Sequence, residues 1–321
     1  MSELYPTYEV PTNEEPKKPH LHPRYENTIT LFKLLLKNKT ATAGLIISLV
    51  YFIFTAMDYI YPQYLGVNNI NSMLSFLKGA SVNSLLPTPP QFNRGWWYYL
   101  GTTEYRIPIL PAMLAALKFD IGYSVLIVVS GAVIGTAIGT ISGFFGKIAD
   151  EILMRTTDVF LSIPFIVLAI AVTFVLGAKF IDLVFALIFI SWPLYARLAR
   201  GQALTLRGRD FIAAATASGS SGLRNVVVHV IPNLLSPIFV QISLSVGRVI
   251  LVFAALYYLS IVRGNEYLPE LGNMMVMGQS YLPYGIWWPV VIPGVFLVVF
   301  VTALNLLGDG LRDVLDPRLR R

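Results

Sequence analysis

Long runs of apolar residues alternate with short polar segments along most of the chain. Six of these runs reach the roughly 20 residues that a helix needs to cross the hydrocarbon core of a bilayer. They occupy residues 41–61, 121–146, 157–178, 180–200, 234–261 and 286–308. A helix satisfies its own backbone hydrogen bonds in lipid. The pattern therefore predicts an all-α, polytopic membrane protein with six transmembrane helices.

The distribution of Lys and Arg predicts which segments face the cytoplasm. With the N-terminus placed inside, cytoplasmic segments hold seventeen of these residues and external segments hold six, while Arg248 lies within a span. This excess favours a multi-pass protein of the cell (plasma) membrane with both termini in the cytoplasm. The predicted parts are a cytoplasmic segment at 1–40, a first span at 41–61, an external loop at 62–120, a five-helix core at 121–308 that includes a cytoplasmic loop at 201–233, and a cytoplasmic tail at 309–321.

Composition supports the membrane interpretation. Hydrophobic residues make up 55% of the chain and charged residues only 13%, about half of the charged fraction of a soluble domain. We therefore expect membrane lipid around the chain. The net charge of +6 is accounted for by the cytoplasmic segments and needs no nucleic acid. Cysteine is absent, which excludes disulfides and thiolate chemistry.

The second apolar run contains glycines at every fourth position, which places them on one face of a helix. They are Gly131, Gly135, Gly139 and Gly143. Such a face lets the backbone of another helix approach closely, and close packing drives helix association in lipid. The pattern predicts a tight contact, either within this bundle or with another subunit.

No residue pattern in the chain indicates catalysis or metal binding. The run GFFGK at 143–147 resembles part of a phosphate-binding loop, but Ile141 and Ile148 stand where that loop needs Gly and Ser or Thr. His, Cys and carboxylate residues do not occur at metal-ligand spacing. We expect no enzyme activity, catalytic residue, metal or cofactor in this chain. If ATP drives it, ATP and Mg²⁺ must be bound by other chains.

The cytoplasmic loop at 201–233 is rich in small residues. Asp210 is positioned to cap a short helix through 211–218, Gly219 ends that helix, and 220–222 form a turn. A second helical piece then begins at 226–231, and Pro232 marks a bend before the fifth span. Small side chains leave a smooth surface that suits docking into another protein's groove. A plain surface loop is the alternative.

Arg248 is a charged residue within the fifth span. A charge at the centre of a bilayer costs about 2.5 to 3.5 kcal/mol on insertion scales, so such residues usually face the bundle interior or a water-filled path. We expect Arg248 to line a path or a subunit interface, with snorkelling or a structural ion pair as the alternative.

Several stretches resemble the permease subunits of ABC importers. The loop resembles their E-A-A-x-x-x-G signature through Ala214, Ala215 and Gly219, with Ala213 in the place of the Glu. Further matches to the dipeptide and oligopeptide branch are LGT at 100–102, DE-MR-DV within 150–159, WP-YAR within 192–197, HVIPN at 229–233, GNM at 272–274, and NLLGDGLRD-LDPR within 305–318. They follow the order and spacing of that branch, so the chain resembles its C-type permease subunit.

The resemblance implies a type I ABC importer permease fold and a set of partners. These are a homologous B-type permease, two ABC ATPase subunits, and an extracytoplasmic solute-binding protein. It also implies roles for two groups of residues. Coupling to an ATPase falls to Asp210, Phe211, Ala213, Ala214, Ala215, Gly219, Ser220, Ser221 and Gly222, and closure of the loop to His229, Pro232 and Asn233.

The implied cargo is a peptide, and an oligosaccharide importer of the same class is the first alternative. An ion-driven carrier or channel is the second. It would need paired acidic residues within the spans or a repeated half, and neither is visible in the sequence.

Overall fold

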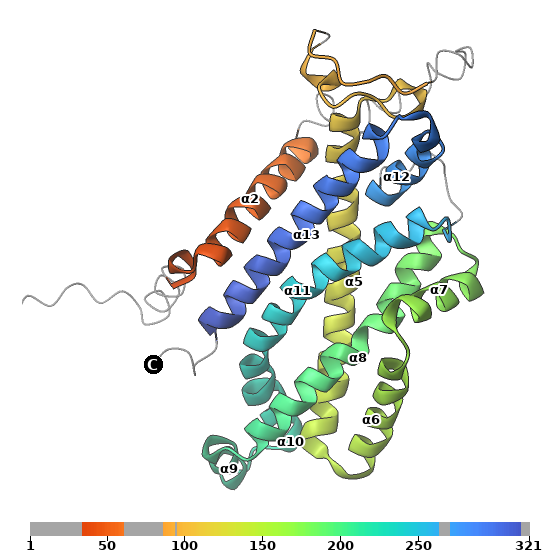
Figure 1. Cartoon of the computed structure of the whole chain (residues 1–321). Coiled ribbons are helices and arrows are strands. Elements are labelled where there is room, and N and C mark those ends of the chain that lie inside the picture. Colours follow the sequence, from red (N-terminus) through yellow and green to blue (C-terminus); the bar gives the residue numbers. More distant parts are fainter. Residues whose placement is uncertain (1–33, 61–85, 94, 263–269, 316–321) are drawn as a thin grey trace, which may run out of the picture.

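The computed structural model describes residues 34–60, 86–93, 95–262 and 270–315 as a bundle of helices without β-strands. Figure 1 shows long helices running side by side between two ends, one carrying α12 and the other carrying α9. The long helices are α2 (Lys39–Ile60), α5 (Ile109–Phe145), α8 (Phe180–Arg207), α11 (Ile231–Tyr258) and α13 (Trp288–Leu315). The shorter elements are α6 (Lys147–Ser162), α7 (Phe165–Leu176), α9 (Asp210–Ala217), α10 (Gly222–Asn225), a π-helical turn (Val226–Val230), α12 (Leu271–Gln279), and single 3-10 turns η2 (Trp96–Tyr98), η3 (Glu104–Arg106) and η5 (Leu282–Tyr284).

The predicted all-helical class is confirmed. Five described helices are long and apolar enough to cross a membrane, and α6 with α7 makes a sixth span if this bent pair counts as one. The segments 1–33, 61–85 and 316–321, which include most of the predicted N-terminal segment and part of the predicted external loop and tail, lie outside the described residues.

The predicted third span at 157–178 is not one helix. α6 and α7 meet at an angle of 95°. Pro164 lies at the break, and the residue before it, Ile163, has an extended backbone with φ −95° and ψ 131°. Proline disfavours the helical conformation in the residue that precedes it. The apolar run is therefore continuous in hydropathy while the chain turns through nearly a right angle (Figure 1).

Two other predicted boundaries differ from the structure. α5 begins at Ile109, whereas the span was predicted from 121, because the polar residues Lys118 and Asp120 were assigned to the external loop. α8 continues to Arg207, so the first residues of the predicted loop at 201–233 are helical. Gly146 ends α5 with φ 66°, and its N–H donates to the carbonyl of Ser142.

The glycine face of α5 packs against α8 within this chain. A Cβ added at Gly131 would lie 2.7 Å from Cβ of Ser191, and one added at Gly143 would lie 2.6 Å from the carbonyl oxygen of Arg200. At Gly135 and Gly139 it would overlap carbonyl oxygens of α8. We call this contact the α5–α8 seam. The predicted tight contact thus occurs inside the bundle.

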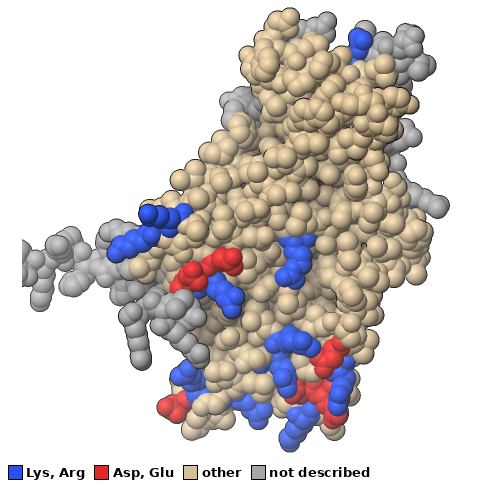
Figure 2. Space-filling view, in the orientation of Figure 1, with Lys and Arg blue, Asp and Glu red and all other residues tan. Residues whose placement is uncertain are grey.

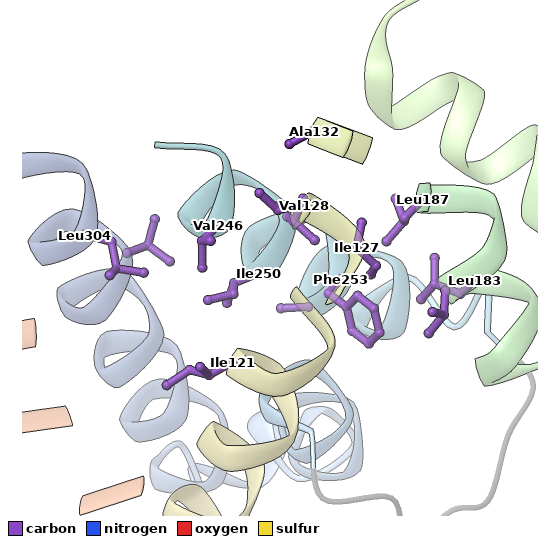
Figure 3. Close-up of a cluster of buried hydrophobic side chains, with 14 of the residues drawn as sticks. Ile121, Ile127, Val128, Ala132, Leu183, Leu187, Val246, Ile250, Phe253 and Leu304 are labelled. Atoms are coloured by element: carbon purple, nitrogen blue, oxygen red, sulfur yellow. The ribbon is translucent and has the colours of Figure 1, made fainter. Parts of the chain in front are cut away.

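The hydrophobic core surrounds α5. Figure 3 shows side chains of α5 meeting those of α8, α11 and α13. The labelled members are Ile121, Ile127, Val128, Ala132, Leu183, Leu187, Val246, Ile250, Phe253 and Leu304. A second close approach joins α2 to α13, where a Cβ at Gly44 would lie 2.7 Å from the backbone nitrogen of Leu307.

Candidate functional site

The loop that follows α8 contains the predicted short helix. α9 covers Asp210–Ala217, and Gly219 follows it with φ 85°, a conformation that favours glycine. One detail of the prediction is wrong. Arg209 occupies the N-cap position and no side chain caps the helix, so Asp210 is its first residue. A carboxylate there still interacts favourably with the positive end of the helix dipole.

A polar contact of the buried Asn225 fixes α9 to the segment that follows it. The amide nitrogen Nδ2 of Asn225 donates to the hydroxyl of Thr216 at 3.0 Å, and that hydroxyl donates to the carbonyl of Ile212 at 2.8 Å. Asn225 and Ile212 are both buried, with 1% and 4% of their surfaces exposed. The Ser221 hydroxyl accepts from the backbone N–H of Arg224 and thereby caps α10. The loop therefore has a defined shape.

The loop also contacts the bundle. A Cβ added at Gly222 would lie 3.2 Å from a ring carbon of Phe145, at the end of α5. The rings of Phe211 and His229 lie 6.4 Å apart, edge to face. Ser220 is half-buried and its hydroxyl has no hydrogen-bond partner in this structure. These contacts place the start of α10 against the end of α5, and they place α9 beside the π-helical turn.

The outer side of α9 is exposed and carries mostly small side chains. Ala213 and Ala214 are exposed and Ala215 is half-buried, while Phe211 and Ser218 project next to them. We call this surface, made of Phe211, Ala213, Ala214 and Ser218, the α9 face. It carries one large side chain and no charge.

The predicted loop-closing residues lie in one continuous helix. His229 belongs to the π-helical turn, and its carbonyl accepts from Nδ2 of Asn233 at 2.7 Å. Pro232 does not interrupt the helix, since residues 222–258 form a single apolar helical run. A proline ring crowds the turn that precedes it. The wider π-helical turn lies just before Pro232 and makes room for the ring.

Two ion pairs join α6 to α8 near the same end of the bundle. Arg200 donates to Asp150 through Nε at 2.5 Å and through a terminal nitrogen at 2.7 Å, and the Ser142 hydroxyl donates to the same carboxylate. Arg197 pairs with Asp158 at a more exposed site. Asp150, Asp158 and Arg197 entered the sequence analysis as anchors of the resemblance, and neither ion pair was predicted. For the second pair the signal was the opposite charges of Asp158 and Arg197 on neighbouring predicted spans.

Figure 2 shows that the charged side chains of this face gather in its lower half, around the end of the bundle that carries α9. The upper part of the same face is largely uncharged. A band without charges followed by a charged end is typical of a helix bundle that passes from lipid into water.

Arg248 lies midway along α11 and borders a pocket of about 230 Å³. The pocket is formed between α5, the junction of α6 and α7, α8 and α11, and its lining is mainly apolar. Its polar members are Ser191, Tyr195, Ser245 and Arg248. The Tyr195 hydroxyl is buried without a hydrogen-bond partner, and Arg248 is exposed. Among the described residues no carboxyl group forms an ion pair with Arg248.

Comparison with known proteins places the chain among transport proteins. Residues 135–321 match the family described as "Binding-protein-dependent transport system inner membrane component". The Di/tripeptide transport system permease protein DppC of Pseudomonas aeruginosa is 35% identical over 73% of this chain and 78% of its own length. Two proteins named Dipeptide transport system permease protein DppC are similar over more of the chain. The one from Haemophilus influenzae is 30% identical over 87% of this chain and 92% of its own, and the one from Alkalihalophilus pseudofirmus is 31% identical over 90% and 89%.

Proposed function

Because the chain belongs to the family of binding-protein-dependent transport system inner membrane components, we propose that it is the permease subunit of an ATP-driven importer of short peptides. Its helical bundle with five to six apolar spans is the type I ABC importer permease fold. The observation that carries the proposal is the similarity to dipeptide permeases over up to 90% of the chain. The same similarity supports peptide as cargo, because all three relatives are named for peptide transport.

The α9 face is the surface that we assign to an ABC ATPase subunit. It is exposed and uncharged, its side chains are small apart from Phe211, and the Asn225–Thr216 contact holds it in place. The helix of residues 222–258 connects it to the membrane-depth part of α11. A displacement of α9 reaches this helix through the short turn at 218–221. Ala213 offers no charge, so this docking relies on shape rather than on an ion pair.

The partner ATPases supply the energy in this proposal. They bind ATP and Mg²⁺, and their closure shifts the α9 loop. The bundle has two states, and docking of the ATPases shifts the equilibrium between them. The size of the shift equals the difference between the docking free energies of the two states. The chain itself performs no chemical step.

A second, B-type permease completes the path. An arginine at membrane depth is costly when it faces lipid. The exposure of Arg248 beside a pocket therefore favours a partner subunit or a watery path on that side of α11. The excess of Lys and Arg on the α9 side supports an orientation with both termini in the cytoplasm. The end that carries α12 then faces the extracytoplasmic solute-binding protein.

Uptake in a strain that lacks this chain tests the proposal. Re-expression of the chain should restore uptake of a labelled dipeptide, and two ATPase subunits should co-purify with it from membranes. Uptake of a labelled oligosaccharide and not of the dipeptide would overturn the assignment of peptide as the cargo. It would not contradict the assignment to an ATP-driven importer. Uptake that persists after the ATPases are inactivated would contradict the ATP-driven mechanism and favour an ion-driven carrier.

A further inference from the structure

Two carboxyl groups are buried together at the end of the bundle that carries α12. Asp120 of α5 is 1% exposed and Glu270, which precedes α12, is 0% exposed. α12 lies very close to α11 here, since a Cβ added at Gly272 would lie 2.6 Å from Cα of Ala254. The sequence analysis found no paired acids in the spans. The structure brings Asp120 of α5 next to Glu270, which lies outside the spans, so this pair joins a span to the segment before α12.

Backbone groups satisfy one oxygen of each carboxyl group. The N–H of Leu271 donates to Oδ2 of Asp120 at 3.3 Å, and the N–H of Asn273 donates to Oε2 of Glu270 at 2.6 Å. The other oxygens, Oδ1 of Asp120 and Oε1 of Glu270, are buried without a partner. No Lys or Arg among the described residues forms an ion pair with either carboxyl group. Buried carboxylates are usually paired or bound to a metal.

Buried hydroxyl groups complete the cluster. Tyr257 of α11 is 5% exposed, and its hydroxyl lies within electrostatic range of both Asp120 and Glu270. The Ser124 hydroxyl follows Asp120 by one turn on the same side of α5 and is fully buried. Neither hydroxyl has a hydrogen-bond partner in this structure. Four oxygens on α5, α11 and the start of α12 thus lack the partners that buried polar atoms normally have.

We propose that this cluster, made of Asp120, Ser124, Tyr257 and Glu270, binds a divalent cation of the calcium type. Calcium takes carboxylate and other oxygen ligands in flexible geometry, with water in the remaining positions. A divalent cation neutralises both carboxylates and contacts several of the unpartnered oxygens. A single shared proton would satisfy at most two of them and leave one buried negative charge.

A bound cation would tie three elements together at this end of the protein. α12 contacts α5 through only a few residues, and Asp120 provides one of those links. The cation would join the start of α12 to α5 and α11. Cation binding requires neither cargo nor the α9 face, which lies at the other end of the bundle (Figure 1).

The test measures calcium binding to the purified full-length chain in detergent. Burial raises the pKa of the Glu270 carboxyl group, so the titration belongs at about pH 8, where protons compete less. Isothermal titration with CaCl₂ should show saturable binding, and the thermal unfolding temperature should rise with calcium concentration. Sodium chloride at matched ionic strength should produce neither effect.

Two variants and one control locate the site. Asp120→Asn should weaken calcium binding at least tenfold, and Glu270→Gln should do the same. Without calcium, Asp120→Asn should unfold at the wild-type temperature or above, because one unpaired buried charge is removed. Asp309→Asn, which changes an exposed acid on α13, should bind calcium like the wild type. Absence of saturable binding to the wild type, or equal binding to all the variants, would overturn the proposal.

Discussion

The α5–α8 seam and the α9 face are both built from small residues, but the structure uses them in opposite ways. At the seam every glycine is buried, and atoms of α8, mostly backbone, occupy the space that a side chain would take. On the α9 face the alanines are exposed, and the glycine that follows has open space around it. The seam has its partner within the chain, whereas we propose that the α9 face has its partner in another protein.

The difference shows that smallness in a sequence does not by itself identify a contact. The seam repeats at four-residue spacing over three turns, which is a packing pattern for one helix pair. The α9 face occupies a single short helix and shows no such repeat. Exposure distinguishes the two cases. A buried small residue allows close packing within the chain, whereas an exposed one either has no packing role or contacts another protein.

The largest effect on stability is expected from Gly139→Ala. Its Cβ would overlap the carbonyl oxygen of Ala196, and backbone cannot move away as a side chain can. Overpacking of this kind costs about 3 kcal/mol of unfolding free energy. Unfolding of the purified protein in detergent measures the loss.

Gly122→Ala is the matched control, because it lies on the same helix with nothing within 4 Å of the added atom. The control should be neutral or stabilised by up to about 1 kcal/mol. Equal effects of the two substitutions would break the distinction between seam and open surface.

Thr216→Val should have an intermediate effect, confined to the α9 region. The substitution leaves the amide of Asn225 buried without its acceptor, which costs about 1 to 2 kcal/mol. Amide hydrogen exchange in residues 210–225 should accelerate while exchange in α5 and α8 stays unchanged. Thr205→Val is the control, because that exposed hydroxyl donates only to the carbonyl of Gly201. Similar exchange rates in the two variants would show that the Asn225 contact does not hold the loop.

The two regions also show how much could be predicted from the sequence. The glycine spacing predicted the seam because steric contact between two helices leaves a regular trace on one of them. The order of helix, turn and helix around Gly219 was predictable because local backbone preferences determine it. Family resemblance then identified the loop. Partner identity could not follow from the small residues alone.

Features that depend on direction or on distant segments were missed. Hydropathy measures how apolar a run is and not where it points, so the bend at Pro164 was hidden inside a predicted span. Asp120 was assigned to a loop because charge normally ends a span, yet it lies within α5 next to the start of α12. Asp120 and Leu271 are separated by 151 positions in the sequence, so their contact leaves no local signal.

Ala214→Leu should have the smallest effect on stability and a large effect on transport. Ala214 is exposed, and Leu has nearly the same helix propensity as Ala, so the unfolding free energy should change by less than about 0.5 kcal/mol. Peptide uptake should nevertheless fall at least tenfold, because the added side chain projects from a surface that must fit another protein. Ala149→Leu is the control, since it adds the same side chain at an exposed position of α6. That control should transport normally at equal membrane abundance. Normal uptake by Ala214→Leu would mean that the α9 face has no partner. The α9 face would then differ from the seam only in being exposed rather than buried.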